Sequence, residues 1–460
     1  MKFPNHFVWG AAAASYQIEG GATADGKGLS VWDMLCRQPG RIADGSTGNI
    51  ACDHYHRYKE DVALMKEMSL KAYRLSISWP RVLPTGKGNI NSTGLSFYDR
   101  LVDELLEAGI APWVTLFHWD FPYDLYCQGG WLNRDSADWF ADYTTIIVDR
   151  LSDRVSNWMT LNEPQCFIGL GLEQGRHAPG DKLRTSEIFR AAHHALLAHG
   201  RAVKVIRSQS KQPATIGWAP VGVATIPNNE NDPADIEAAR QAMFACDNTI
   251  ANPWDVTVVW NNTWWADPVV LGHYPADGLK VLEQKGIELP IQDGDMEIIS
   301  APIDFYGVNI YNGKTVRAGA NGKPETVERP PGFPLSAIKW PVTPSCLRWA
   351  PRFFAERYKL PIVITENGMS CNDWISEDGQ CHDPQRIDFL SRSLKELGRA
   401  INEGTDVRGY FQWSIMDNFE WAEGYRERFG LIHVDYETQK RTVKDSGHWY
   451  KKIIDANDVP

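Results

Sequence analysis

What the chain lacks excludes several classes of protein. No stretch reaches the roughly 18 consecutive apolar residues that a transmembrane helix needs, so no membrane partner is expected. No two of the 8 cysteines have C-x-x-C spacing, which is typical of reduced thiols in a cytoplasmic protein. The apolar run near the N-terminus is too short for a secretion signal. Acidic residues (58) outnumber basic ones (47), and this balance predicts no nucleic-acid partner.

Phosphate-binding and metal-binding patterns are also missing. No glycine-rich G-x-G-x-x-G or G-x-x-x-x-G-K-[ST] motif follows any expected strand. His54 and His56 could form a ligand pair of a metal hydrolase, but the stripe that continues through Tyr58 and Val62 places them on a helix. Side chains two residues apart on a helix point about 200° away from each other. His193 and His194 are adjacent on another expected helix. The sequence therefore predicts no metal and no cofactor.

Short apolar runs alternate along the chain with amphipathic stretches. Eight runs are predicted as strands: Phe7–Ala13, Lys71–Ser78, Ala111–Leu116, Trp158–Asn162, Thr215–Ala219, Asp304–Asn309, Ile362–Glu366 and Val407–Trp413. Ser186–Arg207 and the stretch near Gln385–Glu403 are among the expected helices. Eight parallel strands alternating with helices predict an α/β fold, a single-domain (β/α)₈ TIM barrel over residues 1–460. A doubly wound open sheet is the alternative.

Two stretches interrupt the alternation of strands and helices. Pro227–Trp265 is polar and then aromatic, and Asn312–Pro344 is rich in glycine and proline. Both follow strand ends, so we expect long loops at the C-terminal face of the barrel. Long loops in compact domains are often functional, and these two are expected to wall a pocket.

Two glutamates stand at expected strand ends, each followed by a residue that breaks the strand. Glu163 lies in Thr160-Leu161-Asn162-Glu163-Pro164, and Glu366 lies in Ile364-Thr365-Glu366-Asn367-Gly368. Because active sites of such barrels lie at the C-terminal strand ends, both carboxylates should face one mouth. Glycoside hydrolysis requires such a pair, one protonated and one ionised.

These two segments resemble the signature segments of glycoside hydrolase family 1, the β-glucosidase family, and the resemblance covers essentially the whole chain. The further segments that carry it are Phe7-Val8-Trp9-Gly10, Ser15-Tyr16-Gln17-Ile18-Glu19-Gly20, Arg74-Leu75-Ser76-Ile77-Ser78-Trp79-Pro80-Arg81, Phe117-His118-Trp119-Asp120, Trp413-Ser414 and Asn418-Phe419-Glu420-Trp421.

The resemblance implies a retaining β-glucosidase that acts on terminal β-D-glucosyl residues of cellobiose, short cello-oligosaccharides and aryl β-glucosides. It implies that Glu366 is the nucleophile, Glu163 the general acid/base, and Arg74 the cation beside the nucleophile. The residues that match the family's sugar-binding positions are Gln17, His118, Asn162, Asn309, Tyr311, Trp413, Glu420 and Trp421. Since neighbours on a strand point to opposite faces, Asn162 and Glu163 can share a site only if the strand ends or bulges there.

Other readings of the same barrel stay open. A 6-phospho-β-glucosidase would carry serine where this chain has Glu420, and a carboxylate repels a phosphate. A catalytically silent sugar-binding protein would not need both glutamates and Arg74. Many members of the family carry tryptophan where this chain has Gln165, and the next residue, Cys166, is expected only to pack. The expected partner is a small β-glucoside or oligosaccharide, and side activity on β-galactosides or β-fucosides is expected. A homo-oligomer is left open.

Overall fold

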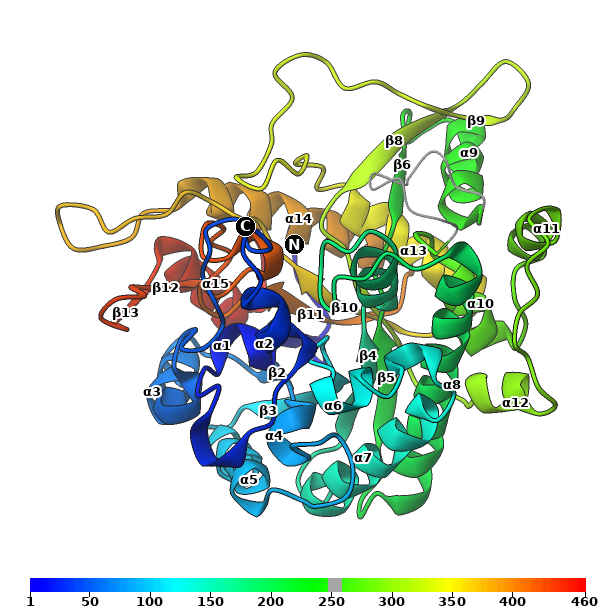
Figure 1. Ribbon diagram of the computed structural model, residues 1–460. Helices are drawn as coiled ribbons and strands as arrows, with labels where there is room; N and C mark the ends of the chain where they lie inside the picture. Colours follow the sequence, from blue (N-terminus) through cyan, green and yellow to red (C-terminus); the bar gives the residue numbers. More distant parts are fainter. Residues whose placement is uncertain (247–258) are drawn as a thin grey trace.

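Eight parallel strands form a barrel in the computed structural model, which describes residues 1–246 and 259–460 (Figure 1). The strands lie in the order β5-β4-β3-β2-β1-β11-β10-β7. They are β1 (Val8–Ala12), β2 (Ala72–Ser76), β3 (Ala111–Phe117), β4 (Asn157–Asn162), β5 (Thr215–Ala219), β7 (Tyr306–Asn309), β10 (Ile362–Asn367) and β11 (Val407–Trp413). All eight predicted strands are therefore confirmed, and the open-sheet alternative is excluded because the two end strands meet.

The barrel closes between β5 and β7. The amide of Asp304 donates to the carbonyl of Ile216 at 2.7 Å, and the amide of Asn309 donates to the carbonyl of Pro220 at 3.0 Å. Gly307 lies at this seam, and a Cβ there would stand 2.1 Å from the carbonyl oxygen of Trp218. Glycine thus lets the last two strands approach each other.

Helices surround the barrel and follow its strands in the chain. The longer ones are α3 (His54–Glu67), α5 (Ser92–Glu107), α7 (Ser136–Leu151), α8 (Thr185–Gln209), α10 (Thr263–Leu271), α13 (Cys346–Tyr358), α14 (Pro384–Asn402) and α15 (Asp445–Ala456). Further helices are α1 (Ser15–Ile18), α2 (Val31–Cys36), α4 (Trp79–Val82), α6 (Tyr123–Tyr126), α11 (Ala276–Gln284) and α12 (Asp295–Ile299), with the 3₁₀ and π turns η1 (Ala24–Gly26), η2 (Gly130–Leu132), η3 (Gln165–Glu173) and η4 (Trp421–Glu423). The expected helices at 186–207 and 385–403 correspond to α8 and α14.

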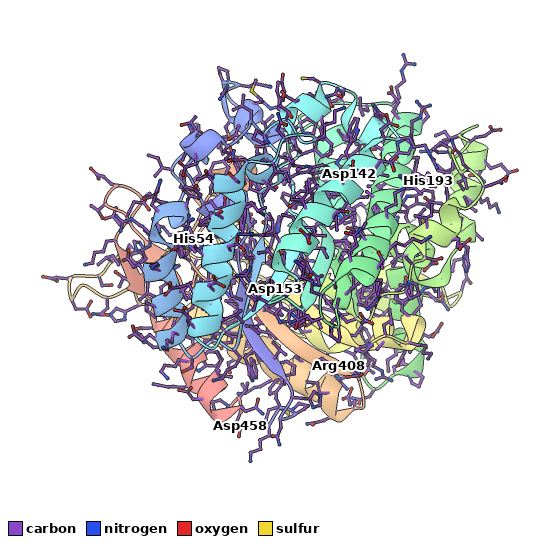
Figure 2. The ribbon with its side chains drawn as sticks, turned by 90° about the horizontal axis from the view of Figure 1, so that it is seen from below. His54, Asp142, Asp153, His193, Arg408 and Asp458 are labelled. Carbon is purple, nitrogen blue, oxygen red and sulfur yellow. The ribbon has the colours of Figure 1, made fainter. Side chains whose placement is uncertain are left out.

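Seen from below, helices α3, α5, α7 and α8 lie side by side along the outside of the barrel (Figure 2). Arg408, the second residue of β11, and Asp153, before β4, lie toward the N-terminal ends of the strands. His54 on α3 and His193 on α8 lie on opposite sides of this view. Among residues 1–246 and 259–460, no group of three or more metal-ligating side chains is close enough to hold a metal ion.

The two stretches expected as loops contain regular structure of their own. The first holds the end of β6 (Ala224–Pro227) and the helix α9 (Pro233–Phe244), and the second holds β8 (Gly313–Ala318) and β9 (Pro324–Thr326). The three strands form a small sheet in the order β6-β8-β9, which rises with α9 above the β5 side of the barrel (Figure 1). Residues 247–258 of the first stretch lie outside the described residues. The described parts lie at the C-terminal face as expected, but they are not loops throughout, because they contain a helix and edge strands.

All 8 cysteines lie in the described residues and are free thiols, as their spacing predicted. Within the described ranges, no helix combines the length and apolar character needed to cross a bilayer.

Candidate active site

A cavity of about 770 Å³ opens at the C-terminal ends of the barrel strands. Its deep part is lined by side chains that follow β3, β4, β7, β10 and β11. Its rim is lined by the small sheet and by residues 337–341, so both interrupting stretches wall the pocket as expected. The expected site residues that line it are His118, Glu163, Asn309, Tyr311, Glu366, Trp413, Glu420 and Trp421.

Glu366 lies near the end of β10 and is 3% exposed. Nη1 of Arg74 on β2 donates to Oε1 of Glu366 at 2.6 Å, and the hydroxyl of Tyr311 donates to Oε2 at 2.8 Å. The same guanidinium donates to the side chains of Thr115 and Asn162, at 3.1 and 2.6 Å. A fully bonded cation therefore holds this carboxylate in one orientation.

Glu163 follows β4 in a left-handed backbone conformation, with φ of 45°. The pairing of β4 with β5 also shifts register between Met159 and Asn162. The strand thus ends irregularly at this point, and the side chains of Asn162 and Glu163 both reach Asn309 on β7. Nδ2 of Asn309 donates both to Oδ1 of Asn162 at 3.0 Å and to Oε1 of Glu163 at 2.8 Å. The sequence-based requirement for a break in the strand is met.

The electrostatic surroundings of the two glutamates differ. Burial, followed by the negative charge of Glu366, raises the pKa of Glu163 to about 7. Burial raises the pKa of Glu366 as well, whereas the Arg74 guanidinium and the Tyr311 hydroxyl lower it. Because the cation contacts only Glu366, we assign the first ionisation of the pair to Glu366 and the retained proton to Glu163.

A second group of polar side chains lies across the cavity, after β1 and β11. Nε2 of Gln17 donates to the carbonyl of Phe419 at 2.9 Å and to Oε2 of Glu420 at 3.3 Å. Among the described residues, Oε1 of Gln17 is buried and receives no hydrogen bond. Burial, then the charge of Glu366, raises the pKa of Glu420 to about 8. These groups form a set of acceptors and donors suited to hydroxyl groups.

His118 connects this polar set to Asn162, the residue before Glu163. Its Nε2 lies 3.0 Å from Nδ2 of Asn162, which is a donor, so the histidine proton is on Nδ1. Burial, followed by the nearby Arg74 charge, lowers the pKa of His118, and the ring is neutral. The His118 ring also stacks against Trp413, with 5.6 Å between the ring centroids.

Indole rings form the remaining walls of the deep cavity. Trp413 is the last residue of β11, and Trp421 packs tilted against Trp119 with 4.5 Å between ring centroids. Trp119 and Trp421 have φ angles of 81° and 48°, left-handed conformations that are uncommon for tryptophan. Together with Glu163, they are three positions with strained backbone angles that line one cavity. Backbone strain of this kind is concentrated at functional sites of proteins.

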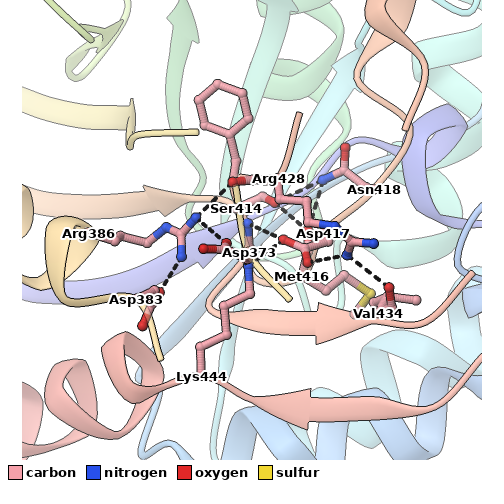
Figure 3. A network of polar contacts seen from close by, with 12 residues as sticks. Asp373, Asp383, Arg386, Ser414, Met416, Asp417, Asn418, Arg428, Val434 and Lys444 are labelled. Carbon is pink, nitrogen blue, oxygen red and sulfur yellow. Dashed lines mark hydrogen bonds and ion pairs between the residues drawn. The ribbon is translucent and has the colours of Figure 1, made fainter. Parts of the chain in front are cut away.

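Buried charged side chains hold the segment after β11 in place (Figure 3). We call them the charge network, and its members are Asp373, Asp383, Asp417, Arg386, Arg428 and Lys444. Nζ of Lys444 donates to Asp373 and to Asp417, at 2.6 Å each. Arg428 pairs with Asp417 at 2.7 Å, and Arg386 pairs with Asp373 at 2.6 Å and also with Asp383. Three cations thus balance three carboxylates beneath the loop that carries Glu420 and Trp421.

Two residues next to the acid have contacts that sequence reasoning missed. Sγ of Cys166 lies 3.1 Å from Oε2 of Glu163, and burial raises the pKa of this thiol so that it stays protonated. Cys166 is buried, as expected of a packing residue, and it also donates to Glu163, a contact that was not expected. The side-chain amide of Gln165 binds the segment after β5. Their positions two and three residues after Glu163 were the one available signal.

Comparisons with known proteins agree with this geometry. The family model of glycosyl hydrolase family 1 matches residues 1–459. β-Glucosidase A of Thermotoga maritima is 44% identical, covering 100% of this chain and 99% of the relative. A bifunctional β-D-glucosidase/β-D-fucosidase of Bifidobacterium breve is 39% identical, covering 99% and 98%.

Solved structures resemble the fold along its whole length. The T. maritima β-glucosidase in complex with deoxynojirimycin has a TM-score of 0.88 at 43% identity, covering 100% of both chains. The same enzyme in complex with a galacto-hydroximolactam gives the same values. The chain therefore belongs to glycosyl hydrolase family 1 and is an enzyme that hydrolyses glycosidic bonds.

Proposed function

We propose that the chain is a retaining β-glucosidase that removes terminal β-D-glucosyl residues from cellobiose, short cello-oligosaccharides and aryl β-glucosides, as one catalytic domain over 1–460. The observation that carries the proposal is the unequal carboxyl pair, Glu366 bound to Arg74 and Glu163 with its pKa raised to about 7. The β-glucosidase names of several relatives support the choice of sugar.

In the first half of the proposed reaction, Glu366 attacks the anomeric carbon and Glu163 protonates the departing glycosidic oxygen. The sugar is then bound covalently to Glu366, whose negative charge is gone. Because that charge helps to raise the pKa of Glu163, its loss lets Glu163 ionise and accept a proton from the attacking water. Tyr311 and Arg74 hold Glu366 for attack.

A continuous chain of hydrogen bonds links the two carboxyl groups. Arg74 contacts both Glu366 and Asn162, and Asn309 contacts both Asn162 and Glu163. For this pair we propose the roughly 5–5.5 Å separation of retaining enzymes and not the wider inverting spacing. We propose that Trp413 packs beneath the sugar ring and that the sugar hydroxyls are bound by Gln17, His118, Asn162, Asn309, Tyr311, Glu420 and Trp421.

The test is a panel of p-nitrophenyl glycosides with Glu366→Ala as the blank. The panel holds the β-glucoside, β-galactoside, β-fucoside, α-glucoside and β-glucoside 6-phosphate. Rapid hydrolysis of the β-glucoside, abolished in the folded variant, is expected because no other group can form the glycosyl-enzyme. The stereochemistry of the first product, followed by NMR, should be β. Activity on the 6-phosphate alone would favour the phospho-glucosidase, and activity on no sugar would favour a binding protein.

A further inference from the structure

The wall of the cavity between β5 and β6, residues 221–223, is held by two buried side-chain amides, which we call the amide clamp. Oε1 of Gln165 accepts from the amide of Val221 at 3.1 Å, and its Nε2 donates to the carbonyl of Val221 at 3.2 Å. Oδ1 of Asn262 accepts from the amide of Val223 at 3.0 Å, and its Nδ2 donates to the Val223 carbonyl at 2.9 Å. Each amide thus pairs twice with one residue of the wall.

Both amides are also anchored outside the wall. Nε2 of Gln165 donates to the carbonyl of Asn261 at 3.3 Å, and Nδ2 of Asn262 donates to the carbonyl of Met243 at 2.8 Å. Gln165 is 0% exposed and Asn262 is 1% exposed. Neither side chain lines the cavity, so the amide clamp cannot itself touch a substrate. Its effect must pass through the wall it holds.

On its other side, the wall packs against β7. Gly222 donates from its amide to the carbonyl of Asn309 at 2.8 Å. A Cβ on Gly222 would stand 2.6 Å from side-chain atoms of Val308 and Ile310. Because Asn309 also donates to Glu163, the amide clamp, the wall and the acid form one connected set of contacts.

The strand order places this wall on the leaving-group side. Between β4, which precedes Glu163, and β10, which carries Glu366, one path around the barrel passes β3, β2, β1 and β11. The proposed sugar-binding residues Gln17, His118 and Glu420 follow strands on that path. The other path passes β5 and β7, which flank the wall, and the two sugar-binding positions on it, Asn309 and Tyr311, contact the carboxyl groups themselves. We therefore place the sugar on the first side, where most of the proposed hydroxyl-binding residues lie, and the leaving group on the second.

We infer that Gln165 and Asn262 are positioning residues that set which leaving groups the enzyme accepts, by fixing the wall at residues 221–223. This inference rests on the proposed function. Since the amide clamp satisfies the backbone groups of Val221 and Val223, the wall presents aliphatic side chains to the cavity. Such a wall can pack against the apolar face of an aryl group or of a second sugar ring. A leaving group of one atom needs no such packing surface.

The test compares β-glucosyl fluoride, whose leaving group is a single atom, with cellobiose, whose leaving group is a sugar. Both give the same glycosyl-enzyme, so the ratio of their kcat/KM values reports the leaving-group side, and an unchanged alkaline limb of the kcat/KM pH profile shows that Glu163 itself is unaltered. Gln165→Leu removes both the donor and the acceptor that hold the wall. In this variant we expect the cellobiose-to-fluoride ratio of kcat/KM values to fall at least about 10-fold, which corresponds to the loss of roughly one or two hydrogen bonds. Gln165→Glu and Asn262→Asp should lower the ratio in the same direction, and they serve if the leucine variant does not fold.

The matched control is Asn91→Leu. Nδ2 of Asn91 also donates to two backbone carbonyls, those of Asp25 and Arg81, but the residue is remote from the cavity. Its ratio should equal that of the unaltered enzyme. Equal losses of kcat/KM on both substrates in the Gln165 and Asn262 variants, or no loss on either, would overturn this inference and leave the proposed function standing. If the unaltered enzyme hydrolyses neither substrate, the proposed function falls, and the inference falls with it.

Discussion

The Glu163 carboxyl receives two hydrogen bonds from donors of unequal strength, an amide from Asn309 and a thiol from Cys166. Both contacts favour the ionised carboxylate and so lower a pKa that burial raises. A thiol is the weaker donor, which leaves this pKa near neutrality. Cys166 therefore offers a way to adjust the acid without touching the substrate-binding residues.

Two replacements of Cys166, by alanine and by serine, should move the alkaline limb of the kcat/KM pH profile in opposite directions. The proposed mechanism requires protonated Glu163, so activity should fall as the pH rises through the pKa of Glu163. Cys166→Ala removes a donor and should shift this limb of kcat/KM to higher pH by about half a unit. Cys166→Ser supplies a stronger donor and should shift it to lower pH. Profiles of both variants that coincide with that of the unaltered enzyme would contradict the role.

Glu163→Ala should affect substrates according to their leaving groups. A 2,4-dinitrophenolate departs without a proton, whereas the sugar released from cellobiose needs one. The first glycosylation step should therefore slow by a factor of about 10²–10⁴ more for cellobiose than for the dinitrophenyl glucoside. Pre-steady-state and steady-state rates on both substrates measure this. Equal slowing would argue against the acid role.

The position of Glu163 and Glu366 at one cavity was predictable from two short segments, but the contacts of their neighbours were not. Glu163 and Glu366 are each followed by a strand-breaking residue, and the break needed to bring Asn162 into the cavity follows from simple alternation. The contacts of Gln165 and Cys166 depend on the wide turn η3, where the chain turns back beside Glu163. No periodicity in the sequence reports such a turn, so an amide and a thiol with defined partners resembled packing residues.

At the scale of elements, the charge network joins three separate parts of the chain. Asp383 precedes α14, Lys444 precedes α15, and Asp417 lies in the loop after β11. Lys444 is the central cation, because it contacts both Asp373 and Asp417 and is 0% exposed. Removing it would leave two buried carboxylates with one cation each.

Lys444→Met should destabilise the fold by about 3–5 kcal/mol, the usual cost of removing one partner of a buried ion pair. Urea unfolding measures this difference. The matched control is Arg408→Met on the N-terminal face, where the pair with Asp406 is half exposed and should contribute less than about 1 kcal/mol. Similar losses in the two variants would show that the network does not contribute as a buried unit.

The eight strands could be predicted because each is a short, buried apolar run, whereas the inserted elements gave weaker signals. Helix α9 does begin with a recognisable cap, since Asp232 accepts from the amide of Ala234 at 2.9 Å and Pro233 follows it. Its polar surroundings nevertheless favoured a loop. Strands β8 and β9 lie at the edge of the barrel mouth, where one face meets solvent and the apolar pattern is diluted.

At the scale of the whole molecule, buried titratable groups set how stability depends on pH. Burial lowers the pKa of three histidines from 6.5, to about 3 for His177 and His199 and about 4 for His194. Below pH 6.5 the unfolded chain binds protons at these sites that the folded chain does not. These histidines therefore make the fold less stable as the pH falls.

Three buried carboxyls act in the opposite sense. Burial raises the pKa of Glu163 and Asp120 to about 7 and that of Glu420 to about 8. Between their unfolded values near 4 and these raised values, the folded chain holds protons that the unfolded chain has lost, so stability falls as the pH rises. Where both groups titrate, between about pH 4.5 and 6.5, the two effects oppose each other.

The free energy of unfolding should therefore be nearly level between about pH 4.5 and 6.5 and should fall on both sides. Urea unfolding from pH 4 to 9 measures the curve. Glu420→Gln should flatten the alkaline side, and His199→Gln should flatten the acid side, because each removes one linked proton. A curve that rises steadily up to pH 8 would contradict this balance.

Asn309 belongs both to the seam that closes the barrel and to the catalytic contacts. Its backbone joins β7 to the segment after β5, and its side chain donates to Glu163. During refolding, the acid can reach its working geometry only after the two ends of the sheet have met. Recovered enzyme activity should therefore report the final assembly step, lagging behind the tryptophan fluorescence that reports earlier burial of the core.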